Sequence, residues 1–506
     1  MEISQLLGLI SASSLFIYSS IFVLSWAVYK LFLYPYLSPL NKIPSIRNAS
    51  FLYGNMKEIF AGEAIDVYIR WMADLNSSII RYYHLFGQER LFVADADAMK
   101  QIMVTNGKNY VKPTFLFGLF IRVAGYGLIS LNGKEHLTQR KLCTGAFKIT
   151  VIKNMLPSFQ RHAEKLIDTW RKQIKKGDNI LKVHHDLHNV TLDIICECGF
   201  GYTTEALCNP EQPETKSLTA IMSSFKPSFL RMIVPSIALN LPTEENKSFK
   251  ENIRRCDDLI HDIITNKKQE INKQEGNMEE RCTNLLTMLL FARDVDTHDG
   301  LSDQQIRDHV MTFMLAGHET TSSGMCWFLL TMAQNPEMQT KLRQEVTSLL
   351  PSKGQPITFE DVEKMTYLNC VVKETLRLYP SAPMTFREAV NDDNINGHFI
   401  PKGTVINIQV GALHRNPKYW EEPEKFIPER FLDDSSIHPY SYLPFIAGSR
   451  MCIGYKFALL EMKVLLASLI REFKFELLPD VTYTKKQLIT MKPNPLLELR
   501  ASIVDY

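Results

Sequence analysis

The sequence predicts a mainly helical protein with a minor β region, preceded by one N-terminal transmembrane helix. Three observations support this fold class. After about residue 150, apolar side chains recur at the spacing of amphipathic or buried helices. Short runs within 77–95 and near 385–410 alternate with the two-residue period of strands. From Ile3 to Tyr29 the chain is rich in apolar residues and contains no charged side chain.

The composition excludes several classes of protein. Of 506 residues, 45% are hydrophobic and 22% are charged, which are ordinary globular values and exclude wholesale disorder. The formal net charge of +2 gives no electrostatic footprint for nucleic acid, so no nucleic-acid partner is expected. The nine cysteines are sparse and odd in number, and their spacing fits neither a disulfide framework nor paired zinc knuckles. A reducing compartment is therefore expected for the folded part.

Residues 1–30 are predicted to form a membrane anchor. Their apolar stretch exceeds the ~20 residues that span the hydrocarbon core of a bilayer. A cleaved signal peptide is the alternative, but it would need a basic segment before a shorter apolar core. Here Glu2 precedes the stretch, and Lys30, Lys42 and Arg47 follow it. The anchor is the preferred interpretation, and the basic residues place the rest of the chain in the cytosol.

Residues 31–48 are predicted to form a hinge, because Pro35, Pro39 and Pro44 prevent a continuous helix. An ordinary linker fits this segment equally well. Residues 49–506 contain no polar linker long enough to divide them, so one domain is expected. A hairpin is expected within 77–95. The clearest predicted helices are 156–177, 308–335, 360–380 and 452–475.

The strongest chemical signal lies where the last of these helices begins. Gly448 allows a tight turn, Arg450 supplies a cation, and Gly454 removes a side chain close behind Cys452. Cys452 is expected at the helix start, where free N–H groups and the positive end of the helix dipole favour a thiolate. Because the thiolate is the metal-binding form, Cys452 is a candidate metal ligand.

The pattern Phe445-x-x-Gly448-x-Arg450-x-Cys452-Ile453-Gly454 resembles the haem-binding signature of the cytochrome P-450 monooxygenases. The resemblance covers nearly all of residues 35–506, and it implies the P-450 fold for a haem-thiolate catalytic domain at 49–506. It also implies haem b as cofactor, with Cys452 as the axial iron ligand and Phe445, Gly448 and Gly454 in the haem-binding loop. A thiolate ligand favours O–O cleavage.

A second segment follows the same family pattern. Ala316-Gly317-His318-Glu319-Thr320-Thr321 resembles the oxygen-activation segment, and Ala316 and Thr320 would share one helix face. Small Ala316 would let the flat haem approach that face. The resemblance implies that Thr320 and Glu319 are catalytic and supply protons during oxygen activation. Taken alone, the segment fits equally well an ion-paired Glu beside a Thr bonded to its own backbone.

Further charged residues extend the resemblance. Glu374-x-x-Arg377 and Phe426-x-Pro428-Glu429-Arg430-Phe431 are similar to the family's structural triad, which implies that Glu374, Arg377 and Arg430 lock the core without a catalytic role. Haem propionates need cations, and the resemblance implies Arg140, Arg387 and Arg450. His136 stands where the family usually has Trp. Imidazole can donate one hydrogen bond, so His136 is a weaker candidate for the same role.

Apolar side chains near these motifs predict a water-poor pocket, although core packing explains most of them singly. They are Phe115, Leu116, Phe117, Leu119, Phe120, Ile121, Phe225, Phe229, Leu230, Ile233, Ile237, Phe313, Leu315, Met384, Phe386 and Met491. The apolar stretch 232–242 is either a membrane contact or a buried turn. A basic helix is either a solvated face or the docking site of an acidic reductase. Its residues are Arg161, Lys165, Arg171, Lys172, Lys175 and Lys176.

With the predicted anchor, the resemblance implies a single-pass endoplasmic reticulum enzyme whose catalytic domain faces the cytosol. It would use O₂ and NADPH electrons, delivered by a flavoprotein reductase, to insert one oxygen atom into a lipophilic fatty acid, sterol, terpenoid or xenobiotic. One alternative is an isomerase or dehydratase acting on peroxides, but such family members commonly lack the acid–threonine pair. A haem sensor or carrier is the other, and it would not need Glu319 and Thr320.

Overall fold

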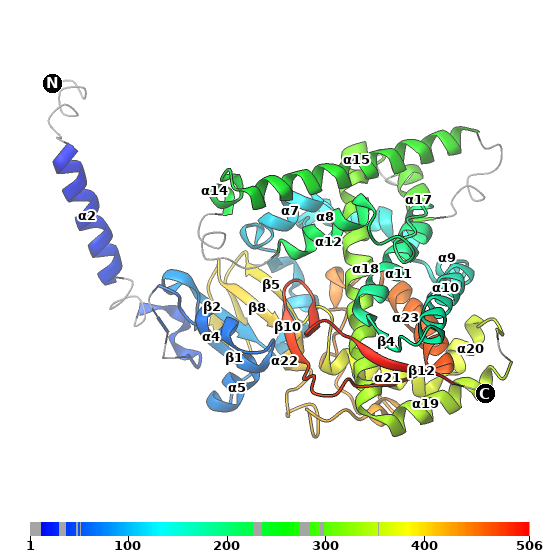
Figure 1. The fold of residues 1–506 in the computed structure, drawn as a ribbon. Helices are drawn as coiled ribbons and strands as arrows, with labels where there is room; N and C mark the ends of the chain where they lie inside the picture. Colours follow the sequence, from blue (N-terminus) through cyan, green and yellow to red (C-terminus); the bar gives the residue numbers. More distant parts are fainter. Residues whose placement is uncertain are drawn as a thin grey trace.

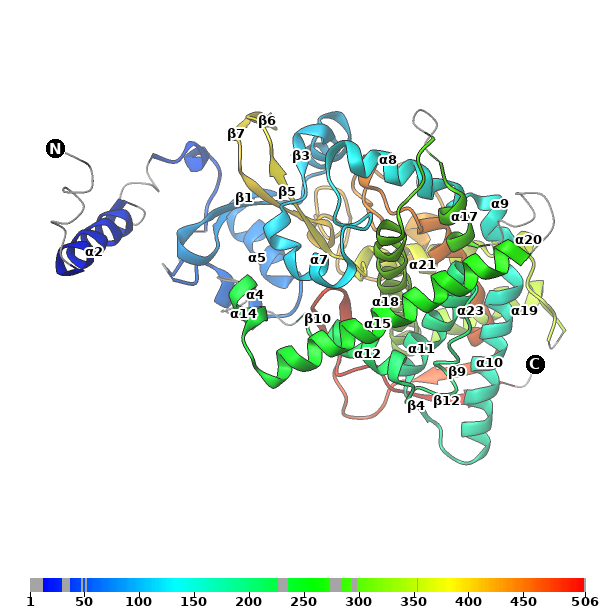
Figure 2. The same ribbon diagram turned by 90° about the horizontal axis from the view of Figure 1, so that it is seen from above.

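The computed structural model of the chain describes residues 12–29, 37–46, 49–50, 52–225, 235–273, 284–293, 298–352 and 354–504. Helices make up most of the body, and small sheets lie beside them (Figure 1). The long helix α18 (Asp303–Gln334) runs through the helical part, and the largest sheet lies between that part and the N-terminal helix (Figures 1 and 2). The predicted class, mainly helical with a minor β region, is confirmed.

The helices of the first half are α2 (Ala12–Val28), α4 (Met56–Ala61), α5 (Asp66–Leu75), α6 (Ala96–Lys100), α7 (Gly118–Ala124), α8 (Gly133–Thr144), α9 (Ile149–Lys153), α10 (Leu156–Lys175), α11 (Val183–Ile195), α12 (Pro213–Ser223) and α14 (Pro235–Asn240). Those of the second half are α15 (Glu244–Lys273), α17 (Leu285–Phe291), α18, α19 (Pro336–Leu349), α20 (Phe359–Lys364), α21 (Thr366–Leu378), α22 (Val410–Leu413) and α23 (Tyr455–Glu472).

The largest sheet has five strands in the order β1-β2-β8-β5-β3. Its strands are β1 (Ile79–Tyr83), β2 (Glu89–Val93), β3 (Tyr110–Val111), β5 (Met384–Ala389) and β8 (Val405–Gln409). Strands β2 and β8 are parallel and the other neighbours are antiparallel. A three-stranded sheet joins β4 (Ile180–Leu181), β12 (Leu499–Ile503) and β9 (Phe473–Glu476), and two hairpins pair β6 (Asp393–Ile395) with β7 (His398–Ile400) and β10 (Thr484–Gln487) with β11 (Met491–Asn494).

Several predicted elements are confirmed. The hairpin expected within 77–95 is β1–β2, and its turn holds Phe86 and Gly87 at positive φ. The alternating segment near 385–410 forms β5 to β8, and the helix predicted at 156–177 is α10. Helix α18 starts at Asp303, before the predicted residue 308, because Ser302 caps it. The Ser302 side chain accepts the N–H of Gln305, and the Gln305 side chain accepts the backbone N–H of Ser302.

Two predicted helices differ from the structure. The segment 360–380 divides at Met365 into α20 and α21, because the Glu345 carboxylate accepts the backbone N–H groups of Tyr367 and Leu368 at 2.7 and 2.8 Å. A carboxylate at that position caps a new helix start. The last helix begins at Tyr455, not at residue 452. Cys452 therefore lies in the loop before α23.

Helix α2 exposes apolar side chains along its length, among them Phe16 at 73%, and it stands apart from the body in both views (Figures 1 and 2). Among the described residues, no helix is both long and apolar enough to cross a membrane. Residues 1–11 and 30–36 of the predicted anchor and hinge lie outside the described residues. Downstream of them, Arg81 on β1 donates its backbone N–H to Pro44 and accepts that of Ile46, so this end of the predicted hinge is fastened to the sheet.

Candidate active site

The backbone holds Cys452 in a defined loop. Its N–H donates to the carbonyl of Phe445 at 2.9 Å, and a 3₁₀ turn at Gly448–Arg450 separates the two residues. Helix α23 begins after Gly454. The loop therefore brings the sulfur to the start of the helix, where the backbone N–H of Gly454 donates to it.

The two glycines of this loop, Gly448 and Gly454, are under different steric constraints. Gly448 has a φ of +68°, and a Cβ atom on it would lie 2.0 Å from the carbonyl oxygen of Met103. The predicted tight turn is therefore confirmed, and it excludes any side chain. On Gly454, a Cβ atom would meet only Phe147 Cε1 at 3.6 Å, an ordinary contact. The surrounding protein therefore leaves room for a small side chain at Gly454, and the predicted role of this glycine behind Cys452 stays a prediction.

The Cys452 thiol is accessible to water, yet protein groups surround it closely enough to shift its pKa. Burial raises the pKa, while the N–H of Gly454 and the guanidinium of Arg140 act in the opposite direction. The net pKa is raised, so the thiol keeps its proton until a positive charge replaces it. A metal ion has that effect on a coordinating thiol.

Five basic side chains gather beside the loop. Four of them lower the pKa of at least one other member, and the fifth, His136, has its own pKa lowered by the other four. The five are Lys112, His136, Arg140, Arg387 and Arg450. Burial, Arg387 and Arg140 lower the pKa of Arg450 to about 10, and burial lowers that of Arg387 to about 10. Burial and the neighbouring cations lower the pKa of His136 to about 3, so its imidazole is neutral. No carboxylate contributes to any of these shifts.

Two N–H groups of this cluster have no partner among the residues that the structure describes. Nη2 of Arg387 and Nη1 of Arg450 are buried and make no hydrogen bond. Another nitrogen of Arg450 donates to Asn132 at 2.9 Å, and Arg140 donates to the Met451 carbonyl at 2.6 Å, next to Cys452. An unsatisfied buried donor costs about 1–3 kcal/mol, and more when charged. The cluster is thus arranged for an anion.

Lys112 is a member of this cluster that the sequence pattern did not predict. Its Nζ donates to the carbonyl of Ile129 at 2.7 Å, and burial, Arg387 and Arg450 lower its pKa well below the usual value. In the sequence, the only indication of its burial is that this lysine stands alone in a largely apolar segment, Tyr110-Val111-Lys112-Pro113-Thr114-Phe115.

Helix α18 is enclosed on nearly every side. From Ile306 to Ala333 its side chains are buried except at Arg307, Ala316, Gly317 and Thr320. Thr320 Oγ1 donates to the carbonyl of Ala316 at 2.7 Å. The helix therefore presents one small, partly accessible patch near its middle, on the face that carries Ala316 and Thr320.

Glu319 is buried and points toward other elements. Its Oε1 accepts from Thr490 Oγ1 at 2.7 Å and from Lys492 Nζ at 2.6 Å, and its Oε2 lies 3.4 Å from His188 Nδ1. Burial opposes its ionisation, yet His188, Lys492 and His318 together hold the pKa of Glu319 well below its usual value. His188, His318 and Glu319 have the donor spacing of a metal site, but Lys492 already supplies the positive charge there.

The backbone holds these partners in place. Met491, between Thr490 and Lys492, accepts hydrogen bonds from Ser323 Oγ at 2.5 Å and Trp327 Nε1 at 2.8 Å, both on α18. Its own N–H donates to Ser381 at 2.9 Å. Strand β11 is thereby fixed against α18, and the side chains on either side of Met491 reach Glu319.

The predicted triad is assembled in the core. Arg377 donates to both Glu374 oxygens at 2.7 and 2.8 Å, and both side chains have no exposed area. Arg430 Nε lies 3.3 Å from the same carboxylate, and the backbone N–H of Ile427 donates to it at 2.8 Å. Remaining Arg377 donors reach backbone carbonyls, so the buried charges are satisfied.

Comparison with known proteins decides the family. A family model described as Cytochrome P450 matches residues 44–499. The chain belongs to the cytochrome P450 family. Cytochrome P450 monooxygenase 205 of Postia placenta is 31% identical over 496 residues, 90% of each chain. Cytochrome P450 4A6 of Oryctolagus cuniculus is 31% identical, covering 88% of this chain and 86% of the relative. Cytochrome P450 4A10 of Rattus norvegicus is 33% identical, covering 78% and 76%.

This P450 is therefore a monooxygenase, and its family implies a haem held by a cysteine thiolate, a lipophilic substrate, O₂ and a redox partner. The residues present fit such a haem. An accessible thiol lies beside basic side chains that have no acidic partner in the described part of the chain, and two of these have buried N–H groups without a hydrogen bond there. Haem carries two propionate carboxylates that would satisfy them.

The described residues among those predicted to line the substrate pocket of this P450 are buried, half-buried or exposed. The half-buried ones are Leu116, Phe117, Leu119, Phe120, Ile121, Phe225, Met384 and Phe386. Phe313, Leu315 and Met491 are buried in the core, whereas Phe115 and Ile237 are largely exposed. Phe120 and Phe225 contact each other, with ring centroids 6.4 Å apart. Phe229, Leu230 and Ile233 lie outside the described residues.

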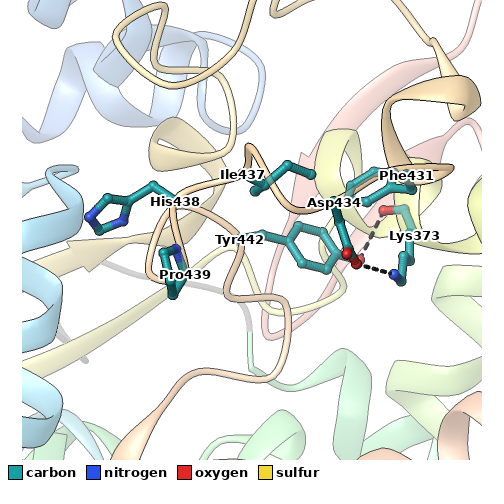
Figure 3. A pocket seen from close by; sticks show the side chains of 7 residues that line it. All are labelled: Lys373, Phe431, Asp434, Ile437, His438, Pro439 and Tyr442. Carbon is teal, nitrogen blue, oxygen red and sulfur yellow. Dashed lines mark hydrogen bonds and ion pairs between the residues drawn. The ribbon is translucent and has the colours of Figure 1, made fainter.

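A separate pocket of about 170 Å³ lies on the outer side of α21, near the triad. Its lining residues are Lys373, Phe431, Asp434, Ile437, His438, Pro439 and Tyr442 (Figure 3). Lys373 Nζ pairs with Asp434 at 2.9 Å, and the Tyr442 hydroxyl donates to the Lys373 carbonyl at 3.0 Å. None of the predicted haem or proton-handling residues lines this pocket.

Proposed function

We propose that this P450 is a membrane-anchored enzyme that inserts one oxygen atom from O₂ into a fatty acid, sterol, terpenoid or xenobiotic. NADPH electrons would reach it through a flavoprotein reductase. The observation that carries the proposal is the accessible Cys452 thiol beside basic side chains that have no acidic partner within the described ranges. When bound, the haem supplies the chemistry of oxygen activation.

The chain's own residues would hold that group as follows. Cys452 would hold the haem iron through its thiolate, which the N–H of Gly454 would stabilise. Arg140, Arg387 and Arg450 bind the propionates, with Lys112 as a fourth cation and neutral His136 as a hydrogen-bond donor. Phe445 and Gly448 close the loop, and Ala316 leaves room for the macrocycle on α18.

Glu319 and Thr320 handle protons in this proposal. Glu319 is ionised while Lys492 is bound to it, so it must take up a proton before it can release one. The Lys492 side chain is 21% exposed, which connects the buried carboxylate to solvent. Thr320 keeps its hydroxyl at the accessible patch of α18 through its bond to Ala316. Glu374, Arg377 and Arg430 remain structural.

We further propose that residues 1–30 anchor the chain in the endoplasmic reticulum membrane, followed by a hinge at 31–48 and the catalytic domain at 49–506 in the cytosol. The uncharged stretch from Ile3 to Tyr29 and the exposed apolar side chains of α2 support the anchor. For reductase docking the support is the basic side of α10, although Arg161 and Arg171 already pair with Glu197 and Glu472.

The first test is the carbon monoxide difference spectrum of the reduced, haem-loaded protein. A strongly red-shifted Soret band is expected for the native chain and should disappear in Cys452→Ala. The matched control is Cys143→Ala, because Cys143 is also a free thiol near Arg140 but is buried in α8. A red-shifted band that survives Cys452→Ala would refute the proposed ligand, and a folded chain that binds no haem would refute the function.

A further inference from the structure

Buried polar atoms lie beside the middle of α18 without a hydrogen-bond partner among the described residues. They are Nδ1 and Nε2 of His188, Nε2 of His318 and Oε2 of Glu319. His188 is 7% exposed, Glu319 is 2% exposed and His318 is 0% exposed. Polar atoms are rarely left unpaired at such depth, so a ligand that binds all three side chains would stabilise this part of the core.

The three side chains converge on one point. One possible ligand atom from each residue lies within 4.8 Å of the other two. The rings of His188 and His318 have centroids 4.6 Å apart and stand at 75° to each other, and Glu319 Oε2 lies 3.4 Å from His188 Nδ1. Two imidazoles and one carboxylate are a common set of zinc ligands, with a fourth position left for water.

The hydrogen bond of His318 leaves one of its nitrogens ready to bind a metal. Its Nδ1 lies 2.5 Å from the carbonyl oxygen of Met314. Because a carbonyl only accepts, Nδ1 carries the proton, and Nε2 keeps a free lone pair. Metal-binding histidines usually make such a second bond, which fixes the ring and its tautomer. Glu319 is oriented in a similar way, since its Oε1 accepts from Thr490 and Lys492.

Two packed helices hold these side chains in place. His188 lies on α11, and the other two residues lie on α18. The helices approach closely at Gly317, where a Cβ atom would lie 2.9 Å from Ile195 Cγ1. Nearby, Thr191 Oγ1 donates to the carbonyl of His318 at 3.1 Å. Ligands on rigid, tightly packed elements keep their relative positions, which favours binding of an ion.

Lys492 does not occupy the unpartnered atoms. Its Nζ lies 2.6 Å from Oε1 of Glu319, whereas the free oxygen is Oε2. As a like charge it would weaken the binding of a metal ion without covering the ligands. The Lys492 side chain is 21% exposed, so it also marks a path from solvent to the buried site.

We propose that His188, His318 and Glu319 form a binding site for a divalent transition-metal ion, with Zn²⁺ as the best fit. Imidazole nitrogens favour zinc over Mg²⁺ and Ca²⁺, which prefer sites made of oxygen atoms. An ion bound to Oε2 would hold Glu319 in its ionised form and prevent it from taking up a proton. The site would thereby inhibit the enzyme, and only this consequence rests on the proposed function.

The experiment measures Zn²⁺ bound by the full, haem-loaded chain in equilibrium dialysis at pH 7. We expect the native chain to bind one ion that excess Mg²⁺ does not displace. His188→Asn and His318→Asn should each weaken this binding by at least about tenfold, because each removes a ligand. Zn²⁺ should also raise the thermal midpoint of the native chain but not that of either variant, since only a folded site binds the ion.

Two further variants serve as controls. His184→Asn is the matched one, because His184 lies one turn before His188 on α11 and its Nδ1 faces Cys326 Sγ at 3.6 Å. It should bind Zn²⁺ like the native chain. Lys492→Met disturbs the same cluster but keeps every ligand, so it should bind Zn²⁺ at least as tightly as the native chain. If a histidine variant does not fold, Glu319→Gln replaces it, since it removes the ligand charge and keeps the shape.

The outcomes separate the metal site from the proposed function. A native chain that binds no Zn²⁺, or that binds it no better than both histidine variants, would refute the site. An equal loss in His184→Asn would show that the loss reflects disturbed packing of α11, and would refute the assigned ligands. None of these results depends on the thiolate carbon monoxide band. Loss of that band from the native chain would instead refute the proposed function and leave the metal site intact.

Discussion

Glu319 stays ionised inside the protein because separate parts of the fold supply its partners. Lys492 and Thr490 come from the β11 hairpin, His188 comes from α11, and His318 precedes Glu319 on α18. A buried carboxylate without such partners would be protonated at neutral pH. The charge state of Glu319 therefore depends largely on residues that are distant from it in the sequence.

Replacing Lys492 tests that dependence at the scale of one residue. We expect Lys492→Met to lower the free energy of unfolding by about 1–3 kcal/mol at pH 7, since it leaves Glu319 with fewer partners. The folded-state pKa of Glu319 lies below its usual value of 4.5, so the stabilisation is present above pH 4.5 and is lost as the pH falls toward the folded-state pKa. The gap between variant and native chain should therefore shrink by about 1 kcal/mol near pH 3.5.

The measurement is the urea midpoint of both chains at pH 7 and pH 3.5. Lys492→Arg serves as the control, because it keeps the charge and should stay within about 1 kcal/mol of the native chain. A gap of equal size at both pH values would show that Lys492 stabilises the fold by packing and not through the charge of Glu319.

At the scale of elements, the loop that carries Cys452 depends on one backbone conformation. The chain turns at Gly448 with a φ of +68° against the carbonyl of Met103. Because a side chain fits neither the conformation nor the space, Gly448→Ala should displace the loop and greatly reduce the thiolate carbon monoxide band. Gly454→Ala meets only Phe147 at 3.6 Å and should keep the thermal midpoint within about 2 °C, a shift of less than 1 kcal/mol.

The two alanine variants form a matched pair and are compared by haem content and by thermal unfolding. An equal loss of haem and of thermal stability in both variants would show that the loop tolerates a side chain at Gly454 no better than at Gly448. Retention of the full band in Gly448→Ala would show that the loop can rearrange without moving Cys452.

Local pattern made most elements of this P450 predictable. Helical periodicity found α10 and α18, and the loop motif singled out Cys452 and Arg450, since each depends on residues close in the sequence. The break at Met365 was not predictable in this way, because its cause is the Glu345 carboxylate on another helix. Lys112 was missed for a related reason, since only the folded chain brings it to Arg387 and Arg450.

At the scale of the whole molecule, the sheet separates two kinds of cationic site. Arg387 projects from β5 toward the cluster beside Cys452, whereas Arg90 on β2 lies near Phe386, on the other face. One face therefore carries a member of the basic cluster beside Cys452, and the other carries a buried arginine that lies near two aromatic rings. The alternation of side chains along a strand makes this separation possible.

The apolar helix α2 leads to a prediction for the complete chain. Its exposed side chains, such as Phe16 and Phe22, would each gain about 1.5–3 kcal/mol on entering an apolar phase. With the uncharged residues around it, this segment should hold the chain in membranes during alkaline carbonate extraction. A chain without residues 1–36 should be released, yet it should keep its thiolate band because the deletion removes no residue of the haem site.

Truncation also separates the anchor from a second membrane contact. Helix α14 exposes Ile237, and Leu241 follows it, so the truncated chain should still bind vesicles weakly at neutral pH. Ile237→Ser in the truncated chain should weaken that residual binding by about two- to tenfold, because one apolar side chain is lost from the contact. If carbonate releases the full chain, residues 1–30 are not a transmembrane anchor. Vesicle binding that is unchanged by Ile237→Ser would place the remaining contact elsewhere on the surface.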